Sequence, residues 1–244
     1  MLYDIPEGID VESGIAGYGI AILQCLRYLE PDLVKERLSA VIIKTLELQN
    51  RNGGWLSDKK LPVFDNGNAG ITWFLLGCYQ LTGNLNLLKR IDTSLQWLVK
   101  KYRSASVTFN GIAGVALTFI KAFEVTGDIR FKNHAEEMLV SIPSRIITNN
   151  YTFNNGLAGL GEIYMEAYRV FKNNKWHHRA GWIAGVFLHT SAGNEEKAYW
   201  IQNDVHAPYA DLIIGNSGII HFLLRYLYPE KVPLMILSDM EPIS

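Results

Sequence analysis

The chain has 244 residues, of which 48% are hydrophobic and 19% carry a formal charge, as is typical of a globular protein with a large core. It has 23 Lys and Arg against 24 Asp and Glu, so no basic excess points to nucleic acid or to a membrane surface. The two cysteines, Cys25 and Cys78, lie in apolar segments and form no disulfide framework, which favours a cytoplasmic protein. The acidic N-terminus has no signal-peptide core, and no apolar stretch is long enough for a membrane span.

One short motif occurs five times along the chain. Each copy reads Gly, any residue, Ala or Ser, then Gly, and an apolar run follows at once. The copies begin at Gly14, Gly67, Gly111, Gly156 and Gly215. A motif that returns every 44 to 59 residues indicates an array of similar supersecondary units.

Each motif is predicted to open a buried helix, because the apolar residues after it have helical spacing on nearly all sides. A turn then leads to a more amphipathic helix, and such helices are predicted over residues 33–48, 87–99 and 131–140. Residues 106–109 and 145–151 are at most short extended links. The pattern therefore predicts an all-α fold of stacked helical hairpins, since a single hairpin cannot bury its own apolar face.

Two of the turns share one signature. Gly83 and Gly127 can adopt the left-handed conformation that ends a helix, and the next residues, Asn84 and Asp128, can cap the helix that follows. The turns thus support hairpins in which an inner helix is followed closely by an outer one.

The five inner helices opened by Gly-x-Ala/Ser-Gly resemble the lanthionine synthetase C-like (LanC-like) cyclases. The resemblance covers nearly all of residues 1–244, and the last copy, 214–220 followed by the apolar segment 223–227, is similar to the family's C-terminal repeat. It implies an α/α-toroid of helical hairpins, usually seven. With five copies visible, it implies either a partial ring from the C-terminal part of a longer synthetase or an unusually short toroid.

The resemblance also implies a reaction. LanC-like cyclases add cysteine thiols of a precursor peptide to dehydroalanine or dehydrobutyrine, and zinc-dependent members bind the metal through a Cys and a Cys-His pair before the glycines of two successive repeats. Here those positions hold Phe109, Asn154 and Asn155, and Asn66 stands where another histidine would precede a glycine. The resemblance therefore implies a cyclase without zinc or another cofactor, similar to the cyclase domain of class III lanthipeptide synthetases.

Such a domain would work on a precursor peptide with leader and core, together with kinase and lyase domains in the same or a partner chain. Two other functions stay open. A catalytically inactive LanC-like domain would bind peptide or hold those domains in place. Another α/α-toroid enzyme, such as a glycosidase or terpene cyclase, lacks support because the sequence shows no close pair of acids set for glycoside hydrolysis and no aspartate-rich metal motif.

The expected site is the mouth where the amino ends of the inner helices meet, because free helix amides favour an anion such as a thiolate or enolate. Polar residues just before or at the start of these helices are the candidates for binding peptide. They are Asp65, Asn66, Asn68, Asn110, Asn154, Asn155 and Asn216. For each asparagine, capping a helix or a turn is the alternative.

Three residues are candidates for proton transfer. Asp10 matches the family's aspartate four residues before a glycine, and it is the first choice for acid–base catalysis. His206 could take the thiol proton, and Tyr209 could protonate the enolate. A surface position is the alternative for each of them. His134 and His221 fall within helices and are interpreted as structural.

Overall fold

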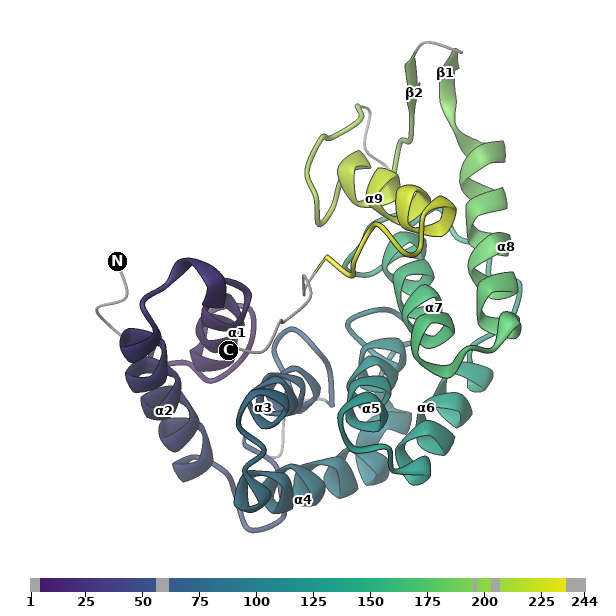
Figure 1. Ribbon diagram of the computed structural model, residues 1–244. Helices are drawn as coiled ribbons and strands as arrows, with labels where there is room; N and C mark the ends of the chain where they lie inside the picture. The colour runs from purple at the N-terminus through teal and green to yellow at the C-terminus, as the bar shows by residue number, and fades with distance from the viewer. Residues whose placement is uncertain (1–4, 56–61, 195–196, 203–206, 236–244) are drawn as a thin grey trace.

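The computed structural model describes residues 5–55, 62–194, 197–202 and 207–235. In this part of the chain, helical hairpins follow one another around an arc, with one helix of each pair inside and the other outside (Figure 1). The predicted all-α array is confirmed. No helix of the described residues is long and apolar enough to cross a membrane.

The inner helices begin where the motif predicts. They are α1 (Ile15–Gln24), α3 (Asn68–Thr82), α5 (Ile112–Thr126), α7 (Leu157–Phe171) and α9 (Asn216–Leu227). In α3, α5 and α7 almost the whole circumference is buried, because each of them packs between two other inner helices and an outer one. These three helices form the centre of the core.

The outer helices are longer than the predicted segments. They are α2 (Pro31–Glu47), α4 (Leu85–Lys101), α6 (Ile129–Ser141) and α8 (Asn174–Thr190), with single 3₁₀ turns at Leu26–Tyr28 and Tyr102–Ser104. The predicted caps explain two of the starts. The Asn84 side chain accepts from the amides of Asn86 and Leu87, and Asp128 accepts from Arg130. The glycines before these caps have φ angles of 61° and 71°.

Successive inner helices pack through a small residue that receives an aromatic ring. A Cβ atom on Gly19 of α1 would lie 2.2 Å from the Phe74 ring of α3. One on Gly161 of α7 would lie 2.4 Å from the Phe222 ring of α9. Because both glycines stand five residues after the first glycine of their motif, the same contact recurs near the two ends of the array.

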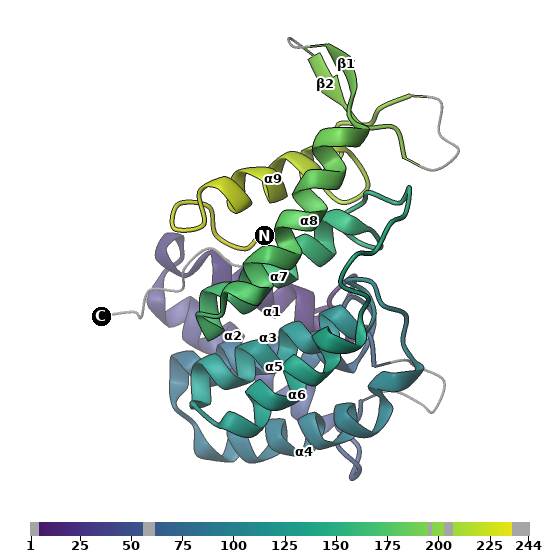
Figure 2. The ribbon, with the colours of Figure 1, turned by 90° about the vertical axis from the view of Figure 1, so that its right-hand side faces the viewer.

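Two features differ from the sequence analysis. Two strands, β1 (Ala192–Asn194) and β2 (Lys197–Tyr199), pair in antiparallel orientation where no strand was expected, and Figure 2 shows them projecting beyond α8. The two strands are too polar and too short to show an alternating pattern. In addition, no outer helix follows α9 among the described residues.

The arc ends in two exposed apolar faces. On α9 this face carries Ile220, Leu224 and Leu227, and at the other end Cys25 and Tyr28 are exposed. Figure 1 places α1 and α9 at opposite ends of the arc, with the segment after α9 returning along its concave side. The described part of the chain is therefore an open arc of four hairpins and one further inner helix.

Candidate functional site

The loops before the inner helices lie on one side of the molecule, the right-hand side of Figure 2 for α3, α5 and α7. We call these loops the rim; it comprises residues 9–14, 62–67, 106–111, 150–156 and 209–215. Each inner helix starts directly after its rim loop, and first amides of these helices donate to carbonyls of the loops, as Ile112 does to Ser106 at 2.6 Å and Leu157 to Asn150 at 3.0 Å. The sequence analysis placed the functional site here.

Hydrogen bonds join each rim loop to the next. The Val11 amide donates to the Asp65 carbonyl at 2.9 Å, and the Asp65 amide donates to Asn110 Oδ1 at 3.1 Å. The Asn110 amide donates to the Asn154 carbonyl at 3.2 Å, and the Asn154 amide to the Ile213 carbonyl at 3.3 Å. The five loops therefore form one continuous belt rather than five separate turns.

A row of phenylalanine rings lies beneath the rim. Ring centroids are 5.3 Å apart for Phe64 and Phe109, and 4.8 Å apart for Phe109 and Phe153. The second glycine of the motif makes this row possible. A Cβ on Gly114 would lie 2.0 Å from the Phe109 carbonyl oxygen, and one on Gly159 would lie 1.8 Å from that of Phe153. Glycine is needed at these positions because the helix start touches the rim backbone directly.

Two of the predicted peptide-binding asparagines are buried and hold a tryptophan loop in place. Asn68 Oδ1 accepts from the Trp55 amide at 3.1 Å, and Asn216 Oδ1 accepts from the Trp200 amide at 2.7 Å. Asn216 Nδ2 also donates to the Trp200 and Tyr209 carbonyls. The structure thus places Asn68 and Asn216 inside the protein as anchors of these loops, and not on the open rim.

The side-chain amides of other asparagines and of a glutamine near the rim differ in how many of their hydrogen-bonding groups remain available to a ligand. Asn66 and Asn155 are exposed, and Asn155 makes one long hydrogen bond, 3.4 Å, with Thr108. Asn154 Oδ1 is buried and accepts no hydrogen bond. Gln202 Oε1 is also buried and accepts no hydrogen bond, whereas Gln202 Nε2 donates to the Ile214 carbonyl at 2.7 Å. Asn154 and Gln202 therefore each have a buried, unsatisfied acceptor, and both residues are hydrogen-bonded to the 213–214 segment of the rim.

Of the three predicted catalytic residues, the structure describes Asp10 and Tyr209, which lie in the first and the last rim loop. Asp10 Oδ1 accepts from the amide and hydroxyl of Ser13, at 3.0 and 3.3 Å, which closes a local turn. Tyr209 is exposed, and its carbonyl accepts from Asn216. His206 lies outside the described residues. Asp10 and Tyr209 stay predictions as proton-transfer groups.

Asp65 is the rim carboxyl whose environment is most unusual. Burial, and secondarily the nearby Glu12 carboxylate, raise the pKa of Asp65 from 3.8 to about 6. No described residue donates a hydrogen bond to its carboxyl group. The structure thus pairs two acids, Glu12 and Asp65, that the sequence analysis did not pair.

The residues at the family's zinc positions do not fit a zinc ion. The Phe109 ring is buried in the phenylalanine row, and Asn154 and Asn155 offer neutral amides in place of a thiolate and an imidazole. The described residues contain no cluster of three or more His, Cys, Asp or Glu side chains that could hold a metal. We therefore derive no step through a metal at this position.

A second polar region lies away from the rim, along the concave side of the arc. Charged side chains of the inner helices form a continuous series of hydrogen bonds and ion pairs, which we call the ion-pair chain. In order along it are His221, Glu162, Arg225, Glu166, Arg169, Glu124, Lys121 and Gln80. It crosses from α9 through α7 and α5 to α3.

The ion-pair chain is most deeply buried where it joins α7 to α9. Arg225 donates to Glu162 Oε2 at 2.8 Å and to Glu166, and neither glutamate is more than 9% exposed at its side chain. Burial opposes the charge of Glu166, yet Arg169 and Arg225 together hold its pKa below the ordinary value. His221 Nδ1 lies 2.7 Å from Glu162 Oε1 at the end of the chain. The interpretation of His221 as structural overlooked this arrangement.

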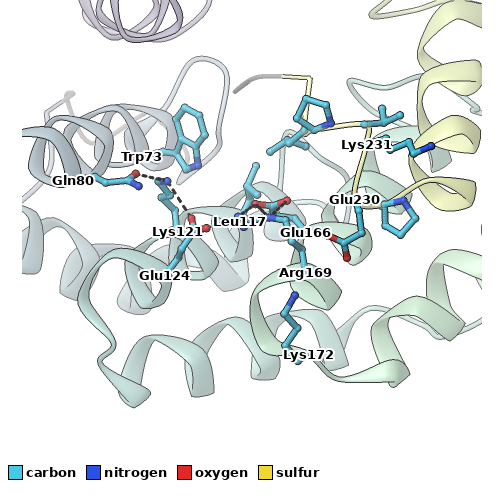
Figure 3. Close-up of a pocket in the computed structure, with 14 residues that line it drawn as sticks. Trp73, Gln80, Leu117, Lys121, Glu124, Glu166, Arg169, Lys172, Glu230 and Lys231 are labelled. Carbon is cyan, nitrogen blue, oxygen red and sulfur yellow. Dashed lines mark hydrogen bonds and ion pairs between the residues drawn. The ribbon is translucent and has the colours of Figure 1, made fainter. Parts of the chain in front are cut away.

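Part of the ion-pair chain lines a pocket of about 370 Å³ (Figure 3). Its walls come from α3, α5 and α7 and from residues 229–234 after α9. Lys121 donates to Gln80 Oε1 at 2.7 Å and to Glu124 at 3.1 Å on one side. The pocket lies toward the carboxyl ends of the inner helices, so it is separate from the rim.

A sequence signal for this region exists. Trp73, Leu117, Glu162 and His221 each follow the first glycine of their motif by six residues, and Trp73 and Leu117 line the pocket. Four residues further on stand Lys121, Glu166 and Arg225. Charged residues at matching places in otherwise apolar helices indicate a shared polar face.

Solved structures of three proteins share this fold. Nisin cyclase superposes with a TM-score of 0.66 and 11% identity, over 93% of this chain and 67% of that chain. A family 76 glycoside hydrolase, a mannosidase from Bacteroides thetaiotaomicron, has a TM-score of 0.55 and 11% identity, over 88% of this chain and 71% of its own. A family 76 α-mannanase from the same organism has a TM-score of 0.56 and 15% identity, over 89% and 68%.

At these identities the structures establish the fold alone. No curated protein matches the sequence. The family model of the lanthionine synthetase C-like proteins matches residues 4–237, which is nearly the whole chain. Together with the repeated motif and the arc of hairpins, this match shows that the chain belongs to the lanthionine synthetase C-like family.

Proposed function

We propose that the chain is a zinc-independent cyclase that adds cysteine thiols of a dehydrated precursor peptide to dehydroalanine or dehydrobutyrine, forming thioether rings. Its membership of the LanC-like family supports the reaction class. The absence of zinc is proposed because Phe109, Asn154 and Asn155 replace the expected ligands. As in class III synthetases, kinase and lyase domains in the cytoplasm would supply the dehydrated peptide.

The observation that carries the proposal is the pair of unsatisfied acceptors on the rim. Asn154 Oδ1 and Gln202 Oε1 are buried without a donor, which costs roughly 1–3 kcal/mol for each group. Both residues are tied to the Ile213–Ile214 segment, through the Asn154 amide and Gln202 Nε2. An extended peptide presents backbone N–H groups that would satisfy both acceptors, once a local shift of the loops exposes these buried oxygens. These amides are therefore suited to hold a peptide across the rim.

The amino ends of the inner helices could stabilise the negative charge that forms when a peptide bound on the rim reacts. Thiol addition produces an enolate, and the amino end of a helix carries about half a positive charge that stabilises a nearby anion. The rim adjoins these helix starts. A peptide bound on the rim would thus have its reacting atoms near groups that favour the charge formed during addition.

The direct test uses a synthetic peptide that carries dehydroalanine and a cysteine a few residues apart. After incubation with the protein, free thiols are blocked with iodoacetamide and the products are weighed by mass spectrometry. We expect unblocked, cyclised peptide to form faster than without protein, and equally fast with EDTA present. Cyclisation abolished by EDTA would contradict zinc independence.

A variant tests the role of the rim. Asn154→Leu removes the acceptor at similar volume and should raise KM roughly five- to tenfold, the equivalent of one hydrogen bond. Asn174→Leu, at the exposed start of α8, is the matched control. An unchanged KM in Asn154→Leu, with cyclisation intact, would remove the rim acceptor from peptide binding.

The second candidate is a LanC-like domain that binds peptide or holds kinase and lyase domains without catalysis. It is favoured by the same three replacements, because Phe109, Asn154 and Asn155 provide neither a thiolate nor an imidazole. A cyclisation rate equal to the protein-free background, combined with measurable binding of the peptide, would support this candidate over the first.

Glu12 and Asp65, the two acids on the rim, suggest a third candidate function, the hydrolysis of glycosides. Glycoside hydrolases work with two carboxyl groups, and Glu12 lies close enough to raise the pKa of Asp65. Two solved structures with this fold act on mannose-containing substrates by their names. Hydrolysis of an α-mannan by the protein, lost in Asp65→Asn, would replace the cyclase proposal, and cyclisation without hydrolysis would dismiss this alternative.

A further inference from the structure

A cyclase without zinc needs another group to deprotonate the thiol, since a free cysteine thiol has a pKa near ~8.5. His221 on α9 has the geometry of such a group. Its Nδ1 lies 2.7 Å from Glu162 Oε1 on α7, and no described residue forms a hydrogen bond with its Nε2. The Glu162 side chain is fully buried, whereas 22% of the His221 side chain is exposed. The buried Glu162 carboxylate thus holds the imidazole at Nδ1, and part of the ring is exposed to solvent.

The partners of Glu162 determine how the imidazole is protonated. Arg225 has only donors, and it donates to Glu162 Oε2 at 2.8 Å and to the Glu162 carbonyl at 3.0 Å. Glu162 is therefore an acceptor on both sides, and it receives the Nδ1–H of His221. In the neutral imidazole, this leaves the lone pair on Nε2, which is the atom that can accept a proton.

The position of His221 in the repeat places it on the concave side of the arc. It follows the first glycine of its motif by the same six residues as Trp73 and Leu117, which line the pocket there. A further turn along α9, Arg225 continues the ion-pair chain toward that pocket through Glu166. His221 and Glu162 are each the sixth residue of their helix, so they are the members of the ion-pair chain that lie nearest the rim.

We propose that His221 is the base that takes the proton from the peptide thiol and returns it to the product, and that Glu162 and Arg225 position it. The inference rests on the cyclase function proposed above. Nε2 removes the S–H proton, and the thiolate sulfur forms a bond to Cβ of the dehydro residue as its C=C π pair moves to give the enolate. The imidazolium Nε2–H then protonates Cα. The net change adds S–H across C=C and consumes nothing else.

The first test uses His221→Asn. The Asn amide can keep the donor to Glu162, because its Nδ2 stands near the place of the imidazole Nδ1, but it has no base. We expect the cyclisation rate of the synthetic peptide to fall roughly 10²- to 10⁴-fold with an unchanged circular-dichroism melt. His178→Asn, at an exposed position of α8, is the matched control and should keep the wild-type rate.

A second measurement separates a base from a structural residue. His221→Ala leaves a space on the concave side, and added imidazole should restore part of the lost rate in this variant but not in wild type. For the positioning residue, Glu162→Gln should lower kcat with KM changed less than about twofold, since it disturbs the imidazole and not the rim. A purely structural His221 would give no rescue by imidazole.

The outcomes also separate this inference from the function on which it rests. Wild-type protein without cyclisation above background contradicts the cyclase function itself. Active wild type together with a fully active His221→Asn variant contradicts only the role of His221. Loss of activity in His221→Asn, with no imidazole rescue of His221→Ala in a protein that still melts cooperatively, also overturns it.

Discussion

The rim and the concave side of the arc use opposite means to join the same helices. The rim is joined by backbone hydrogen bonds and neutral amides, from Val11 through Asp65 and Asn110 to Asn154. The concave side is joined by charged side chains that run from His221 to Lys121. The rim therefore fixes where the helices begin, and the concave side varies in chemistry from one helix to the next.

This difference indicates where function can reside. Groups that close the rim, such as Asn68 and Asn216, are already engaged in holding the protein together. Among the described residues, groups that remain available include the Asp65 carboxyl, the acceptors of Asn154 and Gln202 and the imidazole of His221. Three substitutions test this contrast between a rim held by backbone contacts and a concave face held by side chains.

The largest effect is expected for Gly159→Ala on the rim. Its Cβ would lie 1.8 Å from the Phe153 carbonyl oxygen, and backbone cannot move aside as a side chain does. We expect a loss of more than about 4 kcal/mol in the free energy of unfolding, measured in urea. Gly185→Ala is the control, because nothing lies within 4 Å of its Cβ position and α8 should gain about 0.5–1 kcal/mol. Equal stability of the two variants would contradict the rim as a backbone contact.

A smaller loss is expected for Arg225→Met on the concave side. The change leaves the buried carboxylates of Glu162 and Glu166 without their shared partner, which costs about 3 kcal/mol. Urea unfolding measures it, and Arg130→Met, whose ion pair with Asp128 is exposed, is the matched control with a change near zero. A neutral Arg225→Met would show that the ion-pair chain does not hold α7 and α9 together.

The smallest effect, and the one that depends on pH, is expected for Asp65→Asn. Because the pKa of Asp65 is raised from 3.8 to about 6, ionisation costs the folded state more than the unfolded one. The wild type should therefore lose stability as the pH rises from about 4 to about 6, and the variant should not. Above pH 6 the variant should be more stable by about 1–2 kcal/mol, allowing for partial exposure of the carboxyl.

Thermal melts of both proteins at pH 4 and pH 7 measure this difference. The variant's advantage should appear at pH 7 and vanish at pH 4, where Asp65 is protonated in the folded protein. The same advantage at both values would show that the effect is not ionisation of Asp65.

Local signals in the sequence were sufficient for the framework of the fold. The five motifs mark the starts of the inner helices, and Gly83 and Gly127 with their following caps mark two of the turns, since each depends on a few adjacent residues. Asn68 and Asn216 show the limit of such reasoning. Both directly follow a motif glycine and so adjoin the rim, but their partners Trp55 and Trp200 are 13 and 16 residues away.

The concave side could have been predicted in part. Glu162 and Glu166 on α7, and His221 and Arg225 on α9, have the same four-residue spacing within apolar helices, which indicates a shared polar face. Their pairing across 59 to 63 residues depends on which helices become neighbours. The short strands β1 and β2 have no such pattern, so their residues alone do not predict them.

The exposed faces at the two ends of the arc bear on how such proteins vary in length. Each inner helix makes its extensive contacts with its immediate neighbours in the array. A hairpin gained or lost beside α9 or α1 would therefore leave the other interfaces intact. Nisin cyclase, which shares this fold and of which this chain covers 67%, is a longer chain. Insertion or deletion of whole hairpins at the ends is thus a low-cost route of divergence for this architecture.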